Sequence, residues 1–232
     1  METVYMLHGF LGTSYAHFGP QIRAWRHSYR VVPLDLPGHG RCALDASRPY
    51  YPSALQYLQR TAEEHGPGHM VGASYLGGSV AVRCAVATPM LTKSLVLTGY
   101  APGVPADIVT VWAQSFLILA ARPSTAVEYN KLHGERWRTT LDVVTSDVRE
   151  NPTLASEPVA TFQRLRVPTL VLNGSAKAEE RLAAAQLPEC NPLIQGGLIP
   201  SAGHIASQDQ PKTFDIIVEA FWGRVGDVGH AS

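Results

Sequence analysis

Two residues of this sequence, Ser74 and His204, could act together as a nucleophile and its base. Ser74 lies in the segment Val71–Gly78, where an apolar run predicted as a strand meets a stretch predicted as a helix. A serine on such a sharp turn presents its hydroxyl over the end of a sheet, and its strained backbone needs small neighbours, here Gly72 and Ala73. A histidine within reach could take the serine proton and return it to a leaving group. This pairing predicts chemistry on an acyl bond.

Three segments around these residues resemble motifs of the α/β-hydrolase family. Val71–Gly78 resembles the G-x-S-x-G elbow, in a G-x-S-x-x-G variant with Leu76 in place of the last glycine. Leu7–Thr13 looks like the HG-x-x-G oxyanion loop, and Ala202–His204 looks like the G-H loop after the last strand. The motifs follow the family's order of nucleophile, acid and histidine.

The resemblance implies an oxyanion hole made by two backbone N–H groups, those of Phe10 and Tyr75. Two fixed donors aimed at a developing negative charge make one of the largest contributions to the rate of acyl transfer. His8 is interpreted as a structural hydrogen-bonding residue of its loop. Asp35 and His39 lie in Asp35–Gly40, which resembles the family's D-x-P-G-x-G turn, and they are also interpreted as structural. The resemblance implies no cofactor and no metal.

The family's acid is missing at both of its usual places. Lys177 occupies the position expected for the acid, after the predicted strand Thr169–Leu172, and no carboxylate follows the predicted strand Ser94–Thr98. Nearby carboxylates that could replace it are those of Glu179, Glu180 and Asp107. Glu179 and Glu180 could equally be solvated residues favoured near a helix N-terminus.

Short apolar or β-branched runs alternate with amphipathic stretches along the chain. The predicted strands are Thr3–Leu7, Tyr29–Leu34, His69–Gly72, Ser94–Thr98, Thr169–Leu172 and Pro192–Ile199. The predicted helices are Tyr15–Arg26, Tyr51–His65, Leu76–Ala87, Glu179–Gln186 and Pro211–Trp222. Strands that are apolar on both faces, alternating with helices, predict an α/β fold with a mostly parallel sheet flanked by helices.

Residues 101–166 break this alternation. They show helical periodicity without a convincing strand, and their apolar faces come from Trp112, Phe116, Leu119, Trp137 and Leu141. We predict a helical lid here, over the strand ends where α/β sheets bind ligands, and a core made of residues 1–100 and 167–232. The alternative is a helical layer that only completes the core.

Composition narrows the classes of protein and partner. The chain has 232 residues, is 45% hydrophobic, and carries 19 basic and 19 acidic residues, which argues against nucleic-acid binding. The N-terminus has no basic region before its apolar run, and no apolar run is long enough to span a bilayer. The odd, widely spaced cysteines Cys42, Cys84 and Cys190 are interpreted as reduced thiols. We expect a cytoplasmic protein with a small-molecule substrate, no membrane partner and an oligomeric state that the sequence does not specify.

Three functions fit these observations. The first is a serine esterase or thioesterase that acts on a small, largely apolar acyl group through Ser74 and His204. The second is a non-hydrolytic enzyme of the same fold, a lyase, cyclase or decarboxylase that uses the pair for proton transfer. It is suggested by the loop Leu7–Thr13 and the turn Asp35–Gly40, which resemble those of a menaquinone-pathway lyase that eliminates pyruvate. The third is a binding protein without turnover, although such a protein has no need of the pair.

Overall fold

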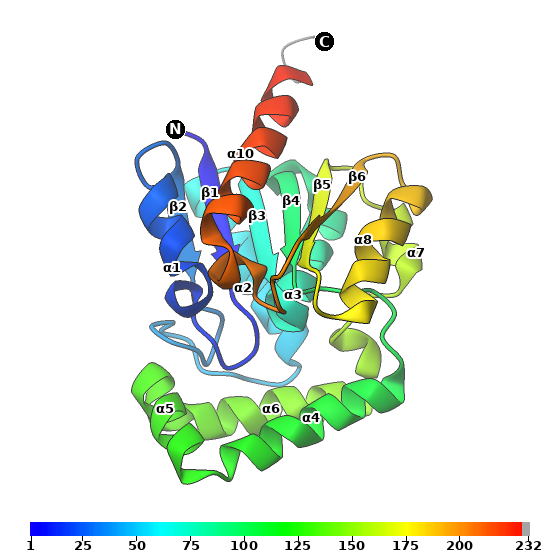
Figure 1. Ribbon diagram of the computed structural model, residues 1–232. Coiled ribbons are helices and arrows are strands. Elements are labelled where there is room, and N and C mark those ends of the chain that lie inside the picture. The colour runs from blue at the N-terminus through cyan, green and yellow to red at the C-terminus, as the bar shows by residue number, and fades with distance from the viewer. Residues whose placement is uncertain (229–232) are drawn as a thin grey trace.

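The computed structural model describes residues 1–228, so the last four residues of the predicted core lie outside it. Six strands form one sheet in the order β2-β1-β3-β4-β5-β6, and every neighbouring pair is parallel (Figure 1). The strands are β1 (Thr3–Leu7), β2 (Arg30–Leu34), β3 (Gly68–Ala73), β4 (Thr92–Thr98), β5 (Thr169–Gly174) and β6 (Ile194–Ile199). The predicted fold class is confirmed, with strand bounds that shift by one or two residues.

Helices cover both faces of the sheet. Those of the α/β alternation are α1 (Ser14–Trp25), α2 (Tyr50–His65), α3 (Ser74–Ala87), α8 (Ala178–Cys190), α9 (Ala206–Asp209) and α10 (Pro211–Val228). A short 3-10 turn, η1 (Pro89–Leu91), precedes β4. The helix predicted over Leu76–Ala87 begins two residues earlier, because it starts directly at the turn that carries Ser74.

Successive residues of β1 belong to two different cores. Tyr5 and Leu7 face the core that α2, α3 and α8 cover, while Val4 and Met6 face the core that α1 and α10 cover. This follows from the period of two along a strand, and it explains why the central strands are apolar at nearly every position. Burial on both faces fixes the sheet as a rigid base for residues at its carboxyl edge.

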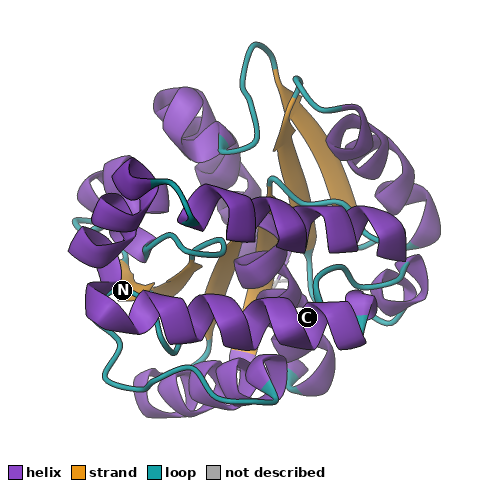
Figure 2. Cartoon of the chain, turned by 90° about the horizontal axis from the view of Figure 1, so that it is seen from below, coloured by secondary structure: helices purple, strands orange, loops and turns teal. Residues whose placement is uncertain are grey.

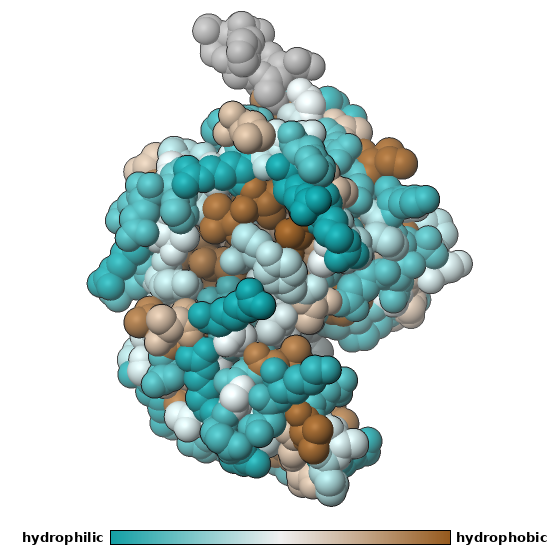
Figure 3. All heavy atoms as spheres, turned by 90° about the vertical axis from the view of Figure 1, so that its left-hand side faces the viewer, coloured by the Kyte–Doolittle hydropathy of each residue, from teal (hydrophilic) through white to brown (hydrophobic). Residues whose placement is uncertain are grey.

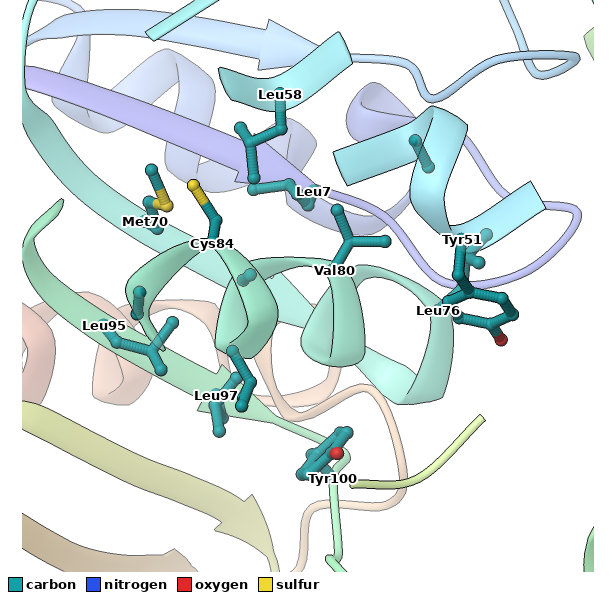
Figure 4. Close-up of a cluster of buried hydrophobic side chains, with 14 of the residues drawn as sticks. Leu7, Tyr51, Leu58, Met70, Leu76, Val80, Cys84, Leu95, Leu97 and Tyr100 are labelled. Atoms are coloured by element: carbon teal, nitrogen blue, oxygen red, sulfur yellow. The ribbon is translucent and has the colours of Figure 1, made fainter. Parts of the chain in front are cut away.

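Helix α3 is buried along most of its length and packs against the sheet and α2. Figure 4 shows Val80 and Cys84 of α3 between Leu58 of α2 and Leu97 of β4. All four side chains have no exposed surface. The first turn of α3 is therefore held firmly at the end of β3, where Ser74 lies.

Residues 101–166 form helices at the carboxyl edge of the sheet, and they contain no strand in the described structure. They are α4 (Ala106–Ala120), α5 (Pro123–His133), η2 (Gly134–Arg136), α6 (Trp137–Glu150), η3 (Pro152–Leu154) and α7 (Val159–Gln163). Helices α4, α5 and α6 lie below the sheet in Figure 1 and cross in front of it in Figure 2, which views the molecule from that side. We call α4–α6 the lid, and the division of the chain into core and lid stays a prediction.

The surface around this architecture is mostly hydrophilic on the face drawn in Figure 3. That face shows the lid as a lower lobe, and hydrophobic side chains gather in a hollow of the body above it. No helix within residues 1–228 is both long enough and apolar enough to cross a membrane.

Candidate active site

Ser74 stands at the junction of β3 and α3 with a backbone φ of 53°. This left-handed conformation is rare for a residue with a side chain, and it turns the hydroxyl out over the end of the sheet. The turn is tight: a Cβ on Gly77 would lie 2.4 Å from the carbonyl oxygen of Leu7 in β1. The elbow therefore needs a glycine at position 77, three residues after the serine, while Leu76 packs into the core.

His204 is hydrogen-bonded to Ser74, as its place in the G-H loop predicts. The Ser74 Oγ lies 2.8 Å from His204 Nε2. The loop that carries His204 is held by a hydrogen bond from the Gly203 N–H to the Asp209 carboxylate (2.7 Å). Gly99, with a φ of 61°, lets the end of β4 approach the loop, since a Cβ there would lie 2.3 Å from the His204 carbonyl oxygen.

A carboxylate, that of Glu180, completes this chain of hydrogen bonds. His204 Nδ1 lies 2.5 Å from Glu180 Oε1, and the Glu180 side chain is fully buried. Glu180 belongs to the first turn of α8, where the helix dipole favours a negative charge. Of the three replacement acids considered from the sequence, the structure brings Glu180 to the histidine, while Glu179 and Asp107 are exposed.

Lys177 occupies the expected acid position without contacting His204 through a hydrogen bond. Its ammonium nitrogen lies 3.7 Å from Glu180 Oε1, and its side chain is 42% exposed. Asn173, at the end of β5, fixes the backbone around this pair. Its amide nitrogen donates to the carbonyl oxygens of Glu180 and Tyr100, both at 2.9 Å. Glu180 is thereby positioned relative to β4 and β5 together.

The segment Gly9–Gly12, which we call the oxyanion loop, leaves one backbone donor free. Three of its N–H groups donate within the protein: Gly9 to His17 Nδ1 (2.9 Å), Leu11 to His39 Nε2 (3.2 Å) and Gly12 to the Gly9 carbonyl (3.0 Å). The Phe10 N–H has no acceptor among the described residues. Because trans peptide groups point their N–H and C=O in opposite directions, holding the Gly9 carbonyl also sets the direction of the Phe10 N–H.

Four histidines surround this loop and its neighbouring turn, and each accepts a backbone N–H. Besides His17 and His39, they are His8, which accepts from Leu36 (2.9 Å), and His133, which accepts from Gly40 (2.9 Å). An imidazole that accepts a hydrogen bond at one nitrogen must be neutral. His8 and His39 are therefore structural, as the sequence predicts. The sequence motifs assign no role to His17 or His133.

Burial keeps these imidazoles neutral, and this predicts acid sensitivity. Burial lowers the pKa of His8 to about 4 and that of His17 to about 3. These histidines take up protons near pH 6.5 in the unfolded chain but only at lower pH in the folded one. Their contribution to the free energy of unfolding is therefore fully present above pH 6.5 and is lost as the pH falls toward 4. We expect the free energy of unfolding to fall by on the order of 2 kcal/mol between pH 7.5 and 5 from His8 alone.

Urea unfolding at several pH values measures this loss. The interval between pH 6.5 and 5 lies above the range in which most carboxylates titrate, so histidines dominate the slope there. His27 is exposed, and His27→Gln is the matched control that should leave the slope unchanged. A free energy of unfolding that stays constant from pH 7.5 to 5 would contradict the prediction.

A cavity of about 340 Å³ opens above Ser74. Its walls are mostly apolar, and the lid supplies many of them; the lid residues that line it include Val109, Trp112, Ala113, Phe116, Leu119, Val144 and Val148. Phe10 packs edge-on against Phe116, with ring centroids 4.8 Å apart. Two apolar residues predicted for the lid, Trp137 and Leu141, instead pack against Leu11 outside the cavity. Lys177 also lines the cavity and adds a charged side chain to its wall.

Comparison of the sequence with known protein families agrees with this geometry. The model of the alpha/beta hydrolase family matches residues 4–215. The chain belongs to the alpha/beta hydrolase family. The family match confirms the predicted family, and the parallel sheet agrees with the predicted fold class.

Three solved structures with the same fold have between 20% and 48% sequence identity to this chain. NosK from Streptomyces actuosus is 48% identical, with a TM-score of 0.94 over 97% of this chain and 99% of that one. MenH from S. aureus is 20% identical, with a TM-score of 0.75 over 97% of this chain and 94% of that one. A putative lipase from Acinetobacter baumannii AYE is also 20% identical, with a TM-score of 0.76 over 97% and 85% of the two chains. The last two likenesses show the fold alone.

One curated protein is similar in sequence to part of this chain. It is the dihydrolipoyllysine-residue acetyltransferase component of the acetoin cleaving system of Cupriavidus necator, which is 34% identical over 98 residues. The match covers 41% of this chain and 26% of that protein's length.

Proposed function

We propose that this hydrolase cleaves an ester or thioester of a small, largely apolar acyl group through an acyl-enzyme on Ser74. The observation that carries the proposal is the continuous chain Ser74–His204–Glu180, with distances of 2.8 and 2.5 Å, at the base of an apolar cavity. A serine, a base and an orienting acid in this order are the requirements of nucleophilic acyl transfer.

In the first half of the proposed reaction, Ser74 Oγ attacks the acyl carbonyl while His204 Nε2 takes its proton. The negative charge that develops on the carbonyl oxygen is stabilised by the N–H groups of Phe10 and Tyr75. The buried Glu180 carboxylate stabilises the imidazolium and holds the ring with its proton on Nδ1. Collapse of the tetrahedral intermediate breaks the bond to the leaving group, which receives the proton from His204.

In the second half, a water molecule attacks the acyl-serine. His204 takes a proton from the water, the oxyanion again lies against the N–H groups of Phe10 and Tyr75, and the proton returns to Ser74 as the acid product leaves. The same groups act in both halves, so no cofactor enters this scheme. The free N–H of Phe10 and the position of Tyr75 in the first turn of α3 support their assignment as the oxyanion hole.

A panel of p-nitrophenyl esters and acyl thioesters, together with a fluorophosphonate that labels active serines, tests this function. Labelling with turnover of short or medium apolar acyl groups supports it. Labelling without hydrolysis of any member would favour the non-hydrolytic enzyme predicted from the sequence as an alternative. Absence of both would favour a binding protein and would exclude the acyl-enzyme.

Because α4 supplies much of the cavity wall, we predict that this helix sets the preference for the acyl group. Trp112 lines the cavity and its ring lies 4.3 Å from that of Tyr75. Trp112→Ala should enlarge the cavity and raise kcat/KM for bulky acyl esters relative to acetyl esters by about tenfold, a change of roughly 1.4 kcal/mol.

Ile118 on the same helix provides the matched control, because its side chain is 55% exposed. Ile118→Ala should leave the ratio of bulky to acetyl turnover within twofold of the wild type. Loss of about 3–5 kcal/mol of stability in Trp112→Ala with an unchanged ratio would instead mark Trp112 as core packing.

A further inference from the structure

His133 reaches from the lid to the oxyanion loop. It is the last residue of α5, and its side chain is almost fully buried, at 2% exposure. Its Nδ1 accepts the Gly40 N–H at 2.9 Å, so its Nε2 carries the proton and donates to the Leu11 carbonyl oxygen at 3.1 Å. One imidazole therefore joins three segments: the lid, the turn at Gly40 and the oxyanion loop.

Leu11, the residue that His133 contacts, has a strained backbone. Its φ is 52°, in the left-handed region that a leucine rarely adopts. A conformation of this kind persists only where its surroundings hold it. His39 accepts the Leu11 N–H on one side and His133 donates to the Leu11 carbonyl on the other. The Leu11 side chain packs in one hydrophobic cluster with Trp137 of the lid.

The conformation of Leu11 determines where Phe10 can lie. Phe10 is the residue directly before Leu11, and its N–H is the free donor that the proposed function assigns to the oxyanion hole. If the Leu11 carbonyl lost its partner, the peptide that joins Leu11 to Gly12 could rotate. The Gly12 N–H would then release the Gly9 carbonyl oxygen, which belongs to the same peptide as the Phe10 N–H. Oxyanion stabilisation depends steeply on geometry, and a misplacement of about 1 Å can cost a hundredfold in rate.

We propose that His133 is a positioning residue through which the seated lid holds the Phe10 N–H in its active orientation. Lid closure and oxyanion stabilisation are then coupled. When α5 moves away from the oxyanion loop, the Leu11 carbonyl loses the His133 donor and the Phe10 N–H loses its active orientation. The inference rests on the proposed function for its effect on turnover, but its effect on the loop can be measured without turnover.

Three substitutions separate the two hydrogen bonds of the ring. His133→Gln places an amide nitrogen near the position of Nε2 and retains a donor to Leu11. His133→Asn places a side-chain oxygen near the position of Nδ1, and so retains an acceptor for Gly40 but is too short to reach Leu11. Arg136→Ala is the matched control, because Arg136 donates to the Gly40 carbonyl oxygen (2.8 Å) and anchors the lid to the same turn without contacting Leu11.

We expect His133→Asn to lower kcat for an ester by about tenfold with KM within twofold of the wild type. His133→Gln and Arg136→Ala should keep kcat within about threefold. Equal losses of kcat in His133→Asn and Arg136→Ala would overturn the proposal, because they would mark His133 as a lid anchor only.

Hydrogen exchange of the Leu11 amide gives a second readout that requires no substrate. Exchange should be faster in His133→Asn by about tenfold and unchanged in His133→Gln and Arg136→Ala. Equal exchange in all three variants and the wild type would overturn the proposal. A wild-type protein that turns over no ester but shows the expected exchange pattern would contradict the proposed function and leave the positioning role supported.

Discussion

Ser74→Ala is expected to abolish labelling by a fluorophosphonate and to lower kcat/KM for the best ester by at least a thousandfold, on the order of 4 kcal/mol. The hydroxyl is the atom that would form the acyl bond, and the structure offers His204 Nε2 no other hydroxyl partner among the described residues. Because the alanine side chain is smaller and apolar, the strained elbow at φ 53° should persist and the protein should remain folded.

Ser115 provides the matched control for labelling. It also lines the cavity, but its hydroxyl donates to the Val111 carbonyl oxygen within α4 and has no base beside it. Ser115→Ala should label at the wild-type rate. His204→Ala should be nearly as damaging to turnover as Ser74→Ala, and the double variant should be little worse than either, because residues that act as one unit lose activity non-additively. Wild-type turnover in Ser74→Ala would exclude the acyl-enzyme.

The fold could be predicted from the sequence because several local signals agree. Each central strand is apolar at successive positions, as burial on both faces requires, and every predicted strand except Ser94–Thr98, which leads into the lid, is followed by a predicted helix. The pair of Ser74 and His204 could be predicted for a related reason. Both residues follow strands of one parallel sheet, and the carboxyl ends of such strands share an edge. The structure confirms that they are hydrogen-bonded.

The position of Glu180 could not be predicted from strand endings alone. Its carboxylate comes from the first turn of α8, three residues after the position where the family motif places its acid. Asn173 ties the start of α8 to the ends of β4 and β5 and so helps to hold this glutamate beside His204. Long-range contacts of this kind leave no periodic signal in a sequence. A glutamate in a first helical turn looks the same whether it is solvated or buried.

The roles of His17 and His133 at the oxyanion loop could not be predicted from the sequence either, for a different reason. His133 lies far along the chain from Leu11, in a segment predicted only as a helical lid. Whether such a histidine is exposed or buried depends on where α5 rests, and that is decided by the packing of Leu11, Trp137 and Leu141. The G-H and HG-x-x-G motifs are local in the sequence, whereas the position of the lid depends on contacts between residues far apart in the chain.

Placing Glu180 at the ring changes what Lys177 substitutions should do. A missing acid would make Lys177→Asp a gain of function, since it would restore the carboxylate at the family's position. With Glu180 Oε1 already 2.5 Å from His204 Nδ1, a second carboxylate nearby adds only repulsion and replaces an ammonium that lies 3.7 Å from that oxygen. Lys177→Asp should therefore give no increase in ester turnover.

Glu180→Gln should lower kcat by a factor on the order of 10⁴, with a much smaller change in KM. The glutamine keeps the size of the side chain and fits the same buried site. It removes the negative charge that stabilises the imidazolium, and its amide can donate to Nδ1, which would shift the ring proton to Nε2 and prevent that nitrogen from accepting the Ser74 proton. Steady-state kinetics with the best ester, alongside fluorophosphonate labelling, measure the loss.

The neighbouring residue supplies the control for this substitution. Glu179 belongs to the same helical turn and is exposed, so Glu179→Gln makes the same chemical change outside the hydrogen-bonded chain. It should keep kcat within twofold of the wild type. If Glu180→Gln retained more than a tenth of wild-type kcat while remaining folded, Glu180 would be a structural partner of His204 without a part in the reaction. Ser74 and His204 would then work as a dyad, in which the carboxylate charge contributes less than about 1.4 kcal/mol to transition-state stabilisation.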